Sequence, residues 1–446
     1  MVFNKNSTRI KIIGAGLAGS EAALFLSKKG YLIDLYEMRP KVKTPIHKTD
    51  LFAELVCSNS LGTTNIFSAS GLLKEEMRIL GSSLLKIAAD CSVEAGQALA
   101  VDREKFSQYI TEKIIFDPNI NVIIDEVESI PKNSFAIVAT GPLTSDKLFN
   151  NLREFLDVME LYFYDATSPI ISFDSIDMDK AFCANRYNKG DSAYINCPMN
   201  EEDYNNFYDE LIKADSIKGH FSDEERYFEG CMPVEELARR GKQTLLYGPM
   251  KPRGLIDPKT LKQPFCAVQL RAENKGNTLF NMVGFQTRLP FKEQNRIFRL
   301  IPALKNAEFV RYGVMHRNIY FKSSSLINEN LESKKVENLF FAGQITGTEG
   351  YIEAVATGLL AAINLDLKIN NKKPLILPRT TALGSLINHI INDTTEKPAP
   401  MHVSFGLLEP LSKNMGKKMR YAEYVNRSLF DLNKCLFDLQ YSYEDK

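Results

Sequence analysis

Tryptophan is absent from the 446 residues. No apolar run approaches the ~18 residues that a membrane-spanning helix needs. The first nine residues also lack the apolar core of a signal peptide. The seven cysteines are odd in number, widely spaced and include no Cys-x-x-Cys pair. We therefore expect neither a disulfide framework nor a metal site, and a reducing cytoplasm is the compartment that fits best.

Net charge is also absent, because Lys plus Arg and Asp plus Glu both number 55. This balance excludes a uniformly basic nucleic-acid binder but leaves RNA binding through a local basic face open. Apolar residues make up 44% of the chain and charged residues 25%, which is typical of globular proteins. At ~150 residues per domain, the length predicts two large units or three smaller ones.

A strand-turn-helix pattern near the start of the chain predicts dinucleotide binding. Residues 9–13 form an expected strand, 20–29 a helix, and 31–36 a second strand that ends in Glu37. In such turns the glycines allow a tight bend, close approach of a pyrophosphate and close helix packing, while the acid binds a ribose. The residues of the turn are Gly14, Ala15, Gly16, Leu17, Ala18 and Gly19.

Two later segments favour FAD over NAD. Residues 134–139 form an expected buried strand that ends in Thr140 and Gly141, which resembles a segment common in flavoproteins with two dinucleotide sites. A second strand, 338–342, leads into a glycine-rich turn and a helix over 352–365. The candidate residues of this turn are Gly343, Gln344, Gly347, Gly350 and Tyr351.

The chain therefore predicts an α/β fold in which a Rossmann-like FAD-binding domain is built from both ends. We expect this domain to cover residues 1–165 and 305–446, with an inserted α/β domain over 166–304. Further expected elements are helices over 72–80, 102–115 and 421–439, and strands over 244–247 and 279–285.

Two cysteines have contexts that could support chemistry. Cys231 lies just before an expected helix that begins at Pro233 and ends at Gly241, where a thiolate is stabilised. Cys57 lies among small polar residues, which indicates a loop after a helix rather than a core. A buried structural thiol remains the alternative for both residues.

Polar clusters add candidates for binding. His316, Arg317 and Asn318 form a dense polar group whose histidine could stack on a planar ring. Several basic residues could contact RNA phosphates, with ordinary solvated surface as the alternative. They are Arg239, Arg240, Lys251, Arg253, Lys417 and Lys418.

Taken together, ten segments resemble the folate- and flavin-dependent tRNA uracil-5-methyltransferase family, whose FAD core is related to glucose-inhibited division protein A. The resemblance spans nearly the whole chain, and the two cysteine contexts are its most specific part. The segments are residues 14–19, 37–40, 53–61, 71–77, 98–103, 229–233, 248–252, 283–287, 311–318 and 341–351.

The resemblance implies transfer of the methylene of 5,10-methylenetetrahydrofolate to C5 of a uracil, with FAD as carrier and reductant and NAD(P)H as the electron source. It implies that Cys231 adds to C6 and that Cys57 is the acid/base, although the reverse assignment stays open. It further places Arg39 near the cofactor and His316 against the folate.

Four positions depart from the family pattern. Gly62 stands where the family commonly has arginine, Gln97 where it has glycine, and Arg288 and Phe291 replace a frequent histidine and tryptophan. The tRNA T-loop is therefore the favoured target, and a uracil of 23S ribosomal RNA is the alternative. Other readings are a flavoprotein that installs carboxymethylaminomethyl groups, a simple flavin oxidoreductase, or a non-catalytic FAD-binding RNA chaperone. The first is expected to be longer and to need a partner GTPase, whereas no obligatory protein partner is evident here.

Overall fold

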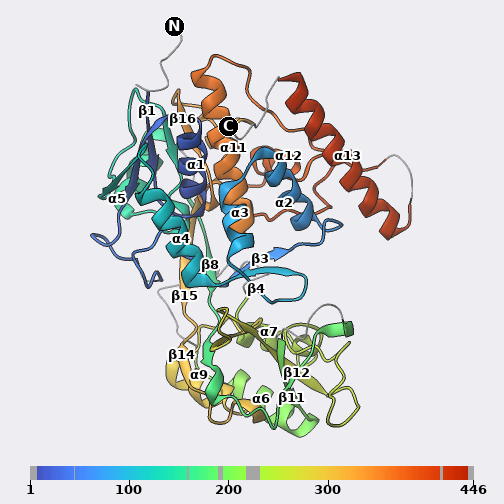
Figure 1. Ribbon diagram of the computed structural model, residues 1–446. Coiled ribbons are helices and arrows are strands. Elements are labelled where there is room, and N and C mark those ends of the chain that lie inside the picture. Colours follow the sequence, from blue (N-terminus) through green and yellow to red (C-terminus); the bar gives the residue numbers. More distant parts are fainter. Residues whose placement is uncertain are drawn as a thin grey trace.

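Two sheets with separate apolar cores organise the chain (Figure 1). The computed structural model describes residues 8–44, 46–157, 160–188, 194–216, 232–411 and 415–439. No helix among these residues is long and apolar enough to cross a membrane.

The first sheet has five strands, all paired in parallel, in the order β16-β7-β1-β2-β6. Short β-branched runs form it because both faces are covered, so that Ile10, Ile12 and Ile33 are fully buried. The strands are β1 (Arg9–Ile13), β2 (Leu32–Glu37), β6 (Ile120–Ile124), β7 (Ala136–Val138) and β16 (Leu339–Phe341).

Two helices from opposite ends of the chain, α1 (Leu17–Lys28) and α11 (Tyr351–Ile369), pack side by side on this sheet (Figure 1). Gly358 permits the contact, since a Cβ there would lie 2.3 Å from the carbonyl oxygen of Ala18. The other helices of this body are α2 (Ala69–Leu80), α3 (Ser83–Asp90), α4 (Arg103–Ile115), α5 (Asp146–Leu156), α10 (Ser323–Leu326), α12 (Ala382–Asn392) and α13 (Lys417–Asp438).

A buried carboxylate ties three of these helices together. Glu76 on α2 accepts hydrogen bonds from the amides of Ala382 and Leu383, at the start of α12, and from the hydroxyl of Ser428 on α13. The helix dipole favours a negative charge at this end. Burial nevertheless raises the pKa of Glu76 to about 7, so the group titrates near neutrality.

The second sheet is antiparallel, with six strands in the order β10-β11-β12-β13-β9-β14 and its own core. Its last strand, β14 (Phe309–Arg311), lies beyond residue 304, the end of the insertion that we expect from the sequence. The strands are β9 (Ile170–Ser172), β10 (Phe182–Cys183), β11 (Tyr194–Met199), β12 (Cys266–Ala272), β13 (Leu279–Met282) and β14 (Phe309–Arg311). The helices that accompany it are α6 (Glu201–Lys213), α7 (Val234–Arg239), α8 (Thr244–Tyr247) and α9 (Phe291–Phe298).

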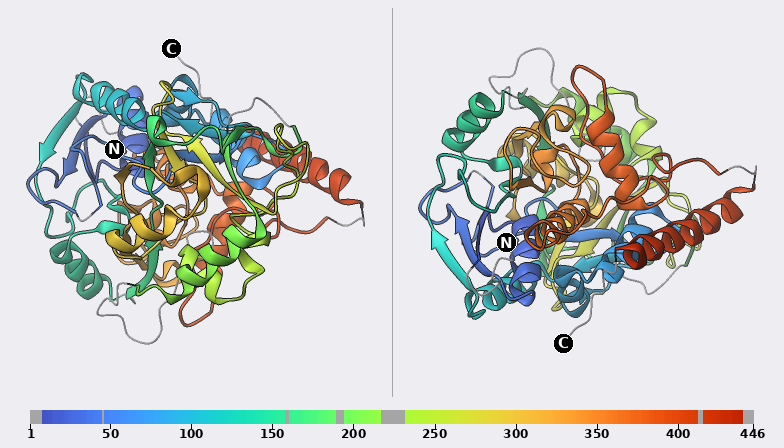
Figure 2. Two further views of the ribbon diagram at one scale, coloured as in Figure 1. Left: turned by 90° about the horizontal axis from the view of Figure 1, so that it is seen from below. Right: turned by 90° about the horizontal axis from the view of Figure 1, so that it is seen from above.

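Smaller elements join the two bodies. An antiparallel pair, β8 (Glu160–Ala166) and β15 (Met315–Phe321), runs between them (Figure 1). A three-stranded sheet in the order β3-β5-β4 lies beside it. Its strands are β3 (Ser60–Thr63), β4 (Ser92–Val93) and β5 (Ala98–Val101). Both views of Figure 2 show α13 at the periphery of the molecule.

The fold class expected from the sequence is therefore confirmed, with one local error among the named elements. Residues 244–247 form helix α8 rather than the expected strand. Threonine and tyrosine favour extended backbone. In this segment, however, backbone amides bond to carbonyl oxygens three or four residues earlier, beginning with the bond from Thr244 to Gly241. The strand expected over 279–285 also ends earlier, at Met282.

Candidate functional site

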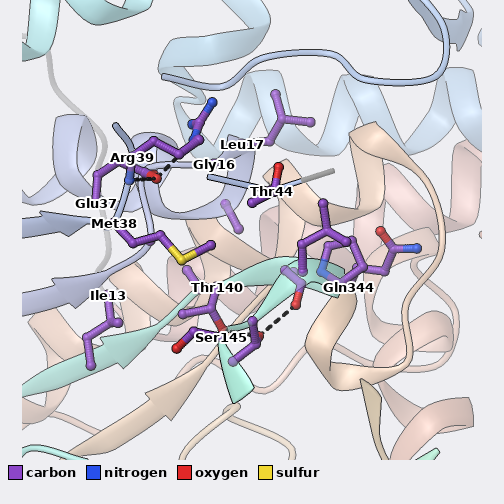
Figure 3. Close-up of a pocket in the computed structure, with 18 of the residues that line it drawn as sticks. Ile13, Gly16, Leu17, Glu37, Met38, Arg39, Thr44, Thr140, Ser145 and Gln344 are labelled. Carbon is purple, nitrogen blue, oxygen red and sulfur yellow. Dashed lines mark hydrogen bonds and ion pairs between the residues drawn. The ribbon is translucent and has the colours of Figure 1, made fainter. Parts of the chain in front are cut away.

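The main pocket lies where the parallel strands end. Because all five strands run in one direction, the residues that follow them meet at one edge of the sheet. Figure 3 shows Glu37 from the end of β2, Thr140 from beyond β7 and Gln344 from beyond β16 around one cavity. The empty space between these residues, including the solvent at its open mouth, is about 1070 Å³.

The first turn has the geometry that a phosphate site needs. Gly14 adopts a φ of 100°, and a Cβ there would lie 2.6 Å from the carbonyl oxygen of Ala139. A Cβ at Gly19 would lie 1.8 Å from the carbonyl oxygen of Gly14, so only glycine allows this packing of helix on strand. A Cβ at Gly16 would instead meet no described protein atom within 4 Å, so the backbone is open to a ligand at that point.

Helix α1 begins beside this opening. Gly16 is its N-cap, and no side chain among the described residues caps the helix. Its first amides therefore have no capping group from the described part of the chain, and a phosphate group is a suitable acceptor for them.

Glu37 is a buried carboxylate that accepts hydrogen bonds from three donors. Its Oε2 accepts from the amide of Ala15 at 3.1 Å, and its Oε1 accepts from the amide and Nε of Arg39, both at 3.0 Å. A carboxylate has about four acceptor positions, so Oε2 retains capacity for a ribose hydroxyl.

Arg39 lines the pocket and holds the loop that follows β2. Its guanidinium donates to the carbonyl oxygens of Thr49 and Leu51 and lies 3.4 Å from the Glu54 carboxylate. Arg39 thus fixes the loop that continues to Cys57.

The two later turns complete the wall. Positive φ values at Gly141, Gly343 and Gly350 bend the chain around the cavity, and a Cβ at Gly141 would meet no described atom within 4 Å. Most of the cofactor residues expected from the sequence line the pocket. They are Gly14, Gly16, Leu17, Ala18, Glu37, Arg39, Thr140, Gly141, Gly343, Gln344, Gly350 and Tyr351. The other expected residues, Ala15, Gly19 and Gly347, support the turns from positions that do not line it.

These features test whether FAD fits. The open backbone at Gly16 and Gly141, the uncapped helix and the buried acid Glu37 correspond to diphosphate and ribose sites. The turn from Gly343 to Tyr351 supplies the far wall. The residues present therefore fit a flavin dinucleotide.

Cys57 lies next to this pocket, in an irregular segment without a preceding helix. Its sulfur lies 2.9 Å from the hydroxyl oxygen of Tyr351, which lines the pocket at the start of α11. The amides of Cys57 and Ser58 donate to the same oxygen at 2.8 and 3.3 Å. Burial, more than the adjacent thiol, raises the pKa of Tyr351 well above its usual value.

Three arginines hold the segment around Cys57. Arg103 on α4 donates to the carbonyl oxygen of Leu55 at 2.7 Å, and Arg311 on β14 donates to that of Val56 at 2.9 Å. Arg271 on β12 donates to the hydroxyl of Ser58 at 2.8 Å and to the side chain of Asn59 at 3.0 Å.

The side-chain nitrogen of Asn59 in turn donates to the carbonyl oxygens of Val101 in β5 and of Ala272 in β12. The Cys57 segment is therefore fixed by residues from both bodies.

Sequence reasoning did not identify these three arginines as parts of the site. Arg103 ends one of the segments that carry the family resemblance, and Arg311 begins another. Their positions in the sequence do not indicate that either contacts the Cys57 segment.

Other expected residues are placed less completely. Cys231 lies outside the described residues, just before Met232 and α7. The backbone of His316 and Arg317 lies in β15, and the described side chains do not include theirs. Asn318 is buried, and its Oδ1 has no hydrogen-bond partner among the described residues.

The expected RNA-contacting residues form two separate groups. Arg239, Arg240, Lys251 and Arg253 belong to the body of the antiparallel sheet, where Arg239 pairs with Glu236. Lys417 and Lys418 lie exposed in the first turn of α13. The structure does not bring the two groups together (Figure 1).

Comparison with known proteins identifies the family. The methylenetetrahydrofolate–tRNA-(uracil-5-)-methyltransferase TrmFO of Dictyoglomus turgidum is 53% identical over 429 residues, which cover 95% of this chain and 97% of that protein. Its namesake from Aquifex aeolicus is 51% identical over 427 residues, which cover 96% of each chain. The chain belongs to the TrmFO family.

Two further findings agree with this assignment. Residues 9–373 match the family model of glucose inhibited division protein A. The GidA structure from Aquifex aeolicus superposes with a TM-score of 0.70 at 18% identity, covering 97% of this chain and 74% of that one, which shows a shared fold. The resemblance found in the sequence is thereby confirmed, as are FAD and methylenetetrahydrofolate as the cofactors expected for the TrmFO family.

Proposed function

We propose that this chain is an FAD-dependent enzyme that forms 5-methyluridine in RNA, with 5,10-methylenetetrahydrofolate as the one-carbon donor and NAD(P)H as the electron source. The observation that carries the proposal is the position of Cys57, whose sulfur lies 2.9 Å from the hydroxyl of a tyrosine that lines the dinucleotide pocket. The names of the TrmFO relatives supply the substrate class.

The pocket residues bind and orient the cofactor. The turn from Gly14 to Gly19 and the start of α1 hold the diphosphate, and Glu37 holds a ribose. The turn from Gly343 to Tyr351 closes the other end. Once bound there and reduced by NAD(P)H, FAD would supply the electron pair that reduces the transferred one-carbon unit to a methyl group.

The cysteines act on the uracil. C5 of uracil becomes nucleophilic only after a group has added at C6, and a thiolate is suited to that step. We assign this addition to Cys231 and removal of the C5 proton to Cys57, with the reverse assignment as the alternative. The fixed backbone around Cys57 supports the proton-transfer role, because such a base must be held within hydrogen-bond reach of its proton.

The remaining assignments belong to the same proposal. His316, Arg317 and Asn318 contact the folate, and the Oδ1 of Asn318, which has no partner among the described residues, is an acceptor available to its polar edge. The basic residues of both bodies contact RNA phosphates. The proposed division is an FAD-binding domain, residues 1–165 and 305–446, and an insertion over 166–304, with the insertion's sheet extended past this boundary by β14 (Phe309–Arg311).

The tRNA T-loop is the favoured target, because the relatives are named for tRNA. A uracil of 23S ribosomal RNA is the second candidate, and Gly62 is the observation that favours it. Gly62 has a φ of 79°, and a Cβ there would lie 2.7 Å from the Ser70 hydroxyl and 3.5 Å from Lys74 Nζ. The arginine typical of the family would be strained at this position, so the surface near Cys57 differs from that pattern.

Nucleoside mass analysis tests the proposal. The purified chain is incubated with FAD, NAD(P)H, methylenetetrahydrofolate and an unmodified transcript of either tRNA or 23S ribosomal RNA. 5-Methyluridine in the tRNA supports the favoured target. The same product in ribosomal RNA alone would make 23S ribosomal RNA the target instead. No product from either transcript, while NAD(P)H still reduces the flavin, refutes RNA methylation and leaves a flavin oxidoreductase or an RNA chaperone.

A further inference from the structure

The hydroxyl of Tyr351 has a defined set of neighbours. Two amides, those of Cys57 and Ser58, donate to its oxygen, and the sulfur of Cys57 lies 2.9 Å away. A phenol oxygen accepts up to two hydrogen bonds and donates one. Since two N–H groups occupy the accepting positions, the hydroxyl proton is left for the sulfur.

The direction of this hydrogen bond determines which form of the thiol it stabilises. A sulfur that accepts a proton from a neighbour is stabilised as the thiolate, which is the stronger acceptor. Burial raises the pKa of Tyr351, so the phenol keeps its proton and remains a donor over the working range of pH.

Charged groups around the pair favour a negative sulfur. The guanidinium groups of Arg103, Arg271 and Arg311 each bond to a residue within two positions of Cys57. Three acids lie nearby: Glu273 is 2.9 Å from Arg103, and Glu37 and Glu54 are 3.0 and 3.4 Å from Arg39. With Arg39 included, four arginines thus face three acids. The local balance is therefore cationic, which stabilises a thiolate.

We propose that Tyr351 is a positioning residue for Cys57, in which the phenol proton holds the sulfur in place and favours its thiolate form. The tyrosine would thus have two functions, since its ring lines the pocket while its hydroxyl acts through the thiol. This inference rests on the proposed function only for the chemistry that Cys57 performs.

Alkylation of Cys57 tests the inference without RNA or folate. The FAD-bound chain is treated with iodoacetamide over a range of pH, and the Cys57 peptide is quantified by mass spectrometry. Tyr351→Phe keeps the ring and removes the hydroxyl, so we expect the pH midpoint of alkylation to rise by about one to two units, as for loss of a hydrogen bond to a charged group.

Tyr31→Phe is the matched control. Tyr31 is fully buried, and its hydroxyl donates to the carboxylate of Asp366 at 2.7 Å. Its removal should leave the midpoint at Cys57 unchanged. An unchanged midpoint in Tyr351→Phe, or an equal rise in both variants, overturns the proposal.

A second measurement covers the case in which Tyr351→Phe does not fold. The ultraviolet thiolate absorbance of the unchanged chain, minus that of Cys57→Ser, should titrate below the ordinary thiol value of ~8.5. Titration at or above that value overturns the proposal. A chain with the expected midpoint that makes no 5-methyluridine refutes the proposed function alone, so the two failures are distinguishable.

Discussion

Gly16→Val separates the needs of the cofactor from those of the fold. Gly16 has a φ of −73°, which any residue can adopt, and a side chain there would meet no described protein atom within 4 Å. The chain without cofactor should therefore accept the valine. The valine would instead occupy the opening through which the backbone of α1 reaches a diphosphate.

The expected loss in affinity follows from the hydrogen bonds that the valine would block. A hydrogen bond from an amide to a charged phosphate contributes ~1.5–3 kcal/mol. Loss of one such bond weakens FAD binding by roughly 10- to 150-fold, at ~1.4 kcal/mol per factor of ten. The cost to the folded chain is that of a poorer N-cap, at most ~1 kcal/mol.

Gly416→Val provides the matched control. Gly416 is the N-cap of α13, has a φ of −60°, and a Cβ there would also meet no described atom within 4 Å. Both variants should thus lose the same small amount of stability, but only Gly16→Val should lose FAD. Flavin fluorescence titration measures the affinity and chemical unfolding measures the stability. Wild-type affinity in Gly16→Val would refute the proposed phosphate site.

Three further predictions concern the catalytic thiol, a buried acid and the RNA-binding surface. Cys231→Ala should abolish 5-methyluridine formation while the protein stays FAD-bound, and product at the wild-type rate would refute the nucleophile assignment. Burial raises the pKa of Glu76 from 4.5 to about 7, so the unfolded chain releases this proton first and the free energy of unfolding should fall as pH rises between those values. Glu76→Gln should make that slope shallower in chemical unfolding series, whereas an unchanged slope would show that the acid does not titrate there. RNA affinity should weaken with salt, and replacing Lys417 and Lys418 by alanine should reduce the salt slope by about two, because each lysine neutralises one phosphate.

Local sequence patterns were sufficient for the parallel sheet and its turns. The strand expected over 9–13 is β1. A short run with β-branched residues that is followed by glycine is typical of a buried strand in an α/β fold. Helix α1 begins at Leu17 rather than Ser20, since its N-cap is the second glycine of the turn. Four residues such as 244–247 contain too little periodicity to distinguish a strand from one helical turn, and that expectation was wrong.

The surroundings of Cys57 could not be read from the sequence, because they depend on tertiary contacts. Tyr351 belongs to a glycine-rich turn, and that pattern predicts that it lies at the pocket. The pattern does not predict its contact with Cys57, which is distant in the sequence. Arg271 and Arg311 are single cations in the strands of another sheet. Only the approach of the two bodies gives these residues a common function.

The order in which the ribosome makes the chain adds a constraint to the pocket. Strand β16 is paired in the sheet beside β7, yet it is synthesised after the whole antiparallel sheet. The nascent chain therefore has the first phosphate turn early and lacks the wall from Gly343 to Tyr351 until late. Full enclosure of the dinucleotide, and the partner of the Cys57 sulfur, become available together only when α11 has emerged. Complete enclosure of the cofactor therefore depends on folding of the chain up to α11, which includes both sheets.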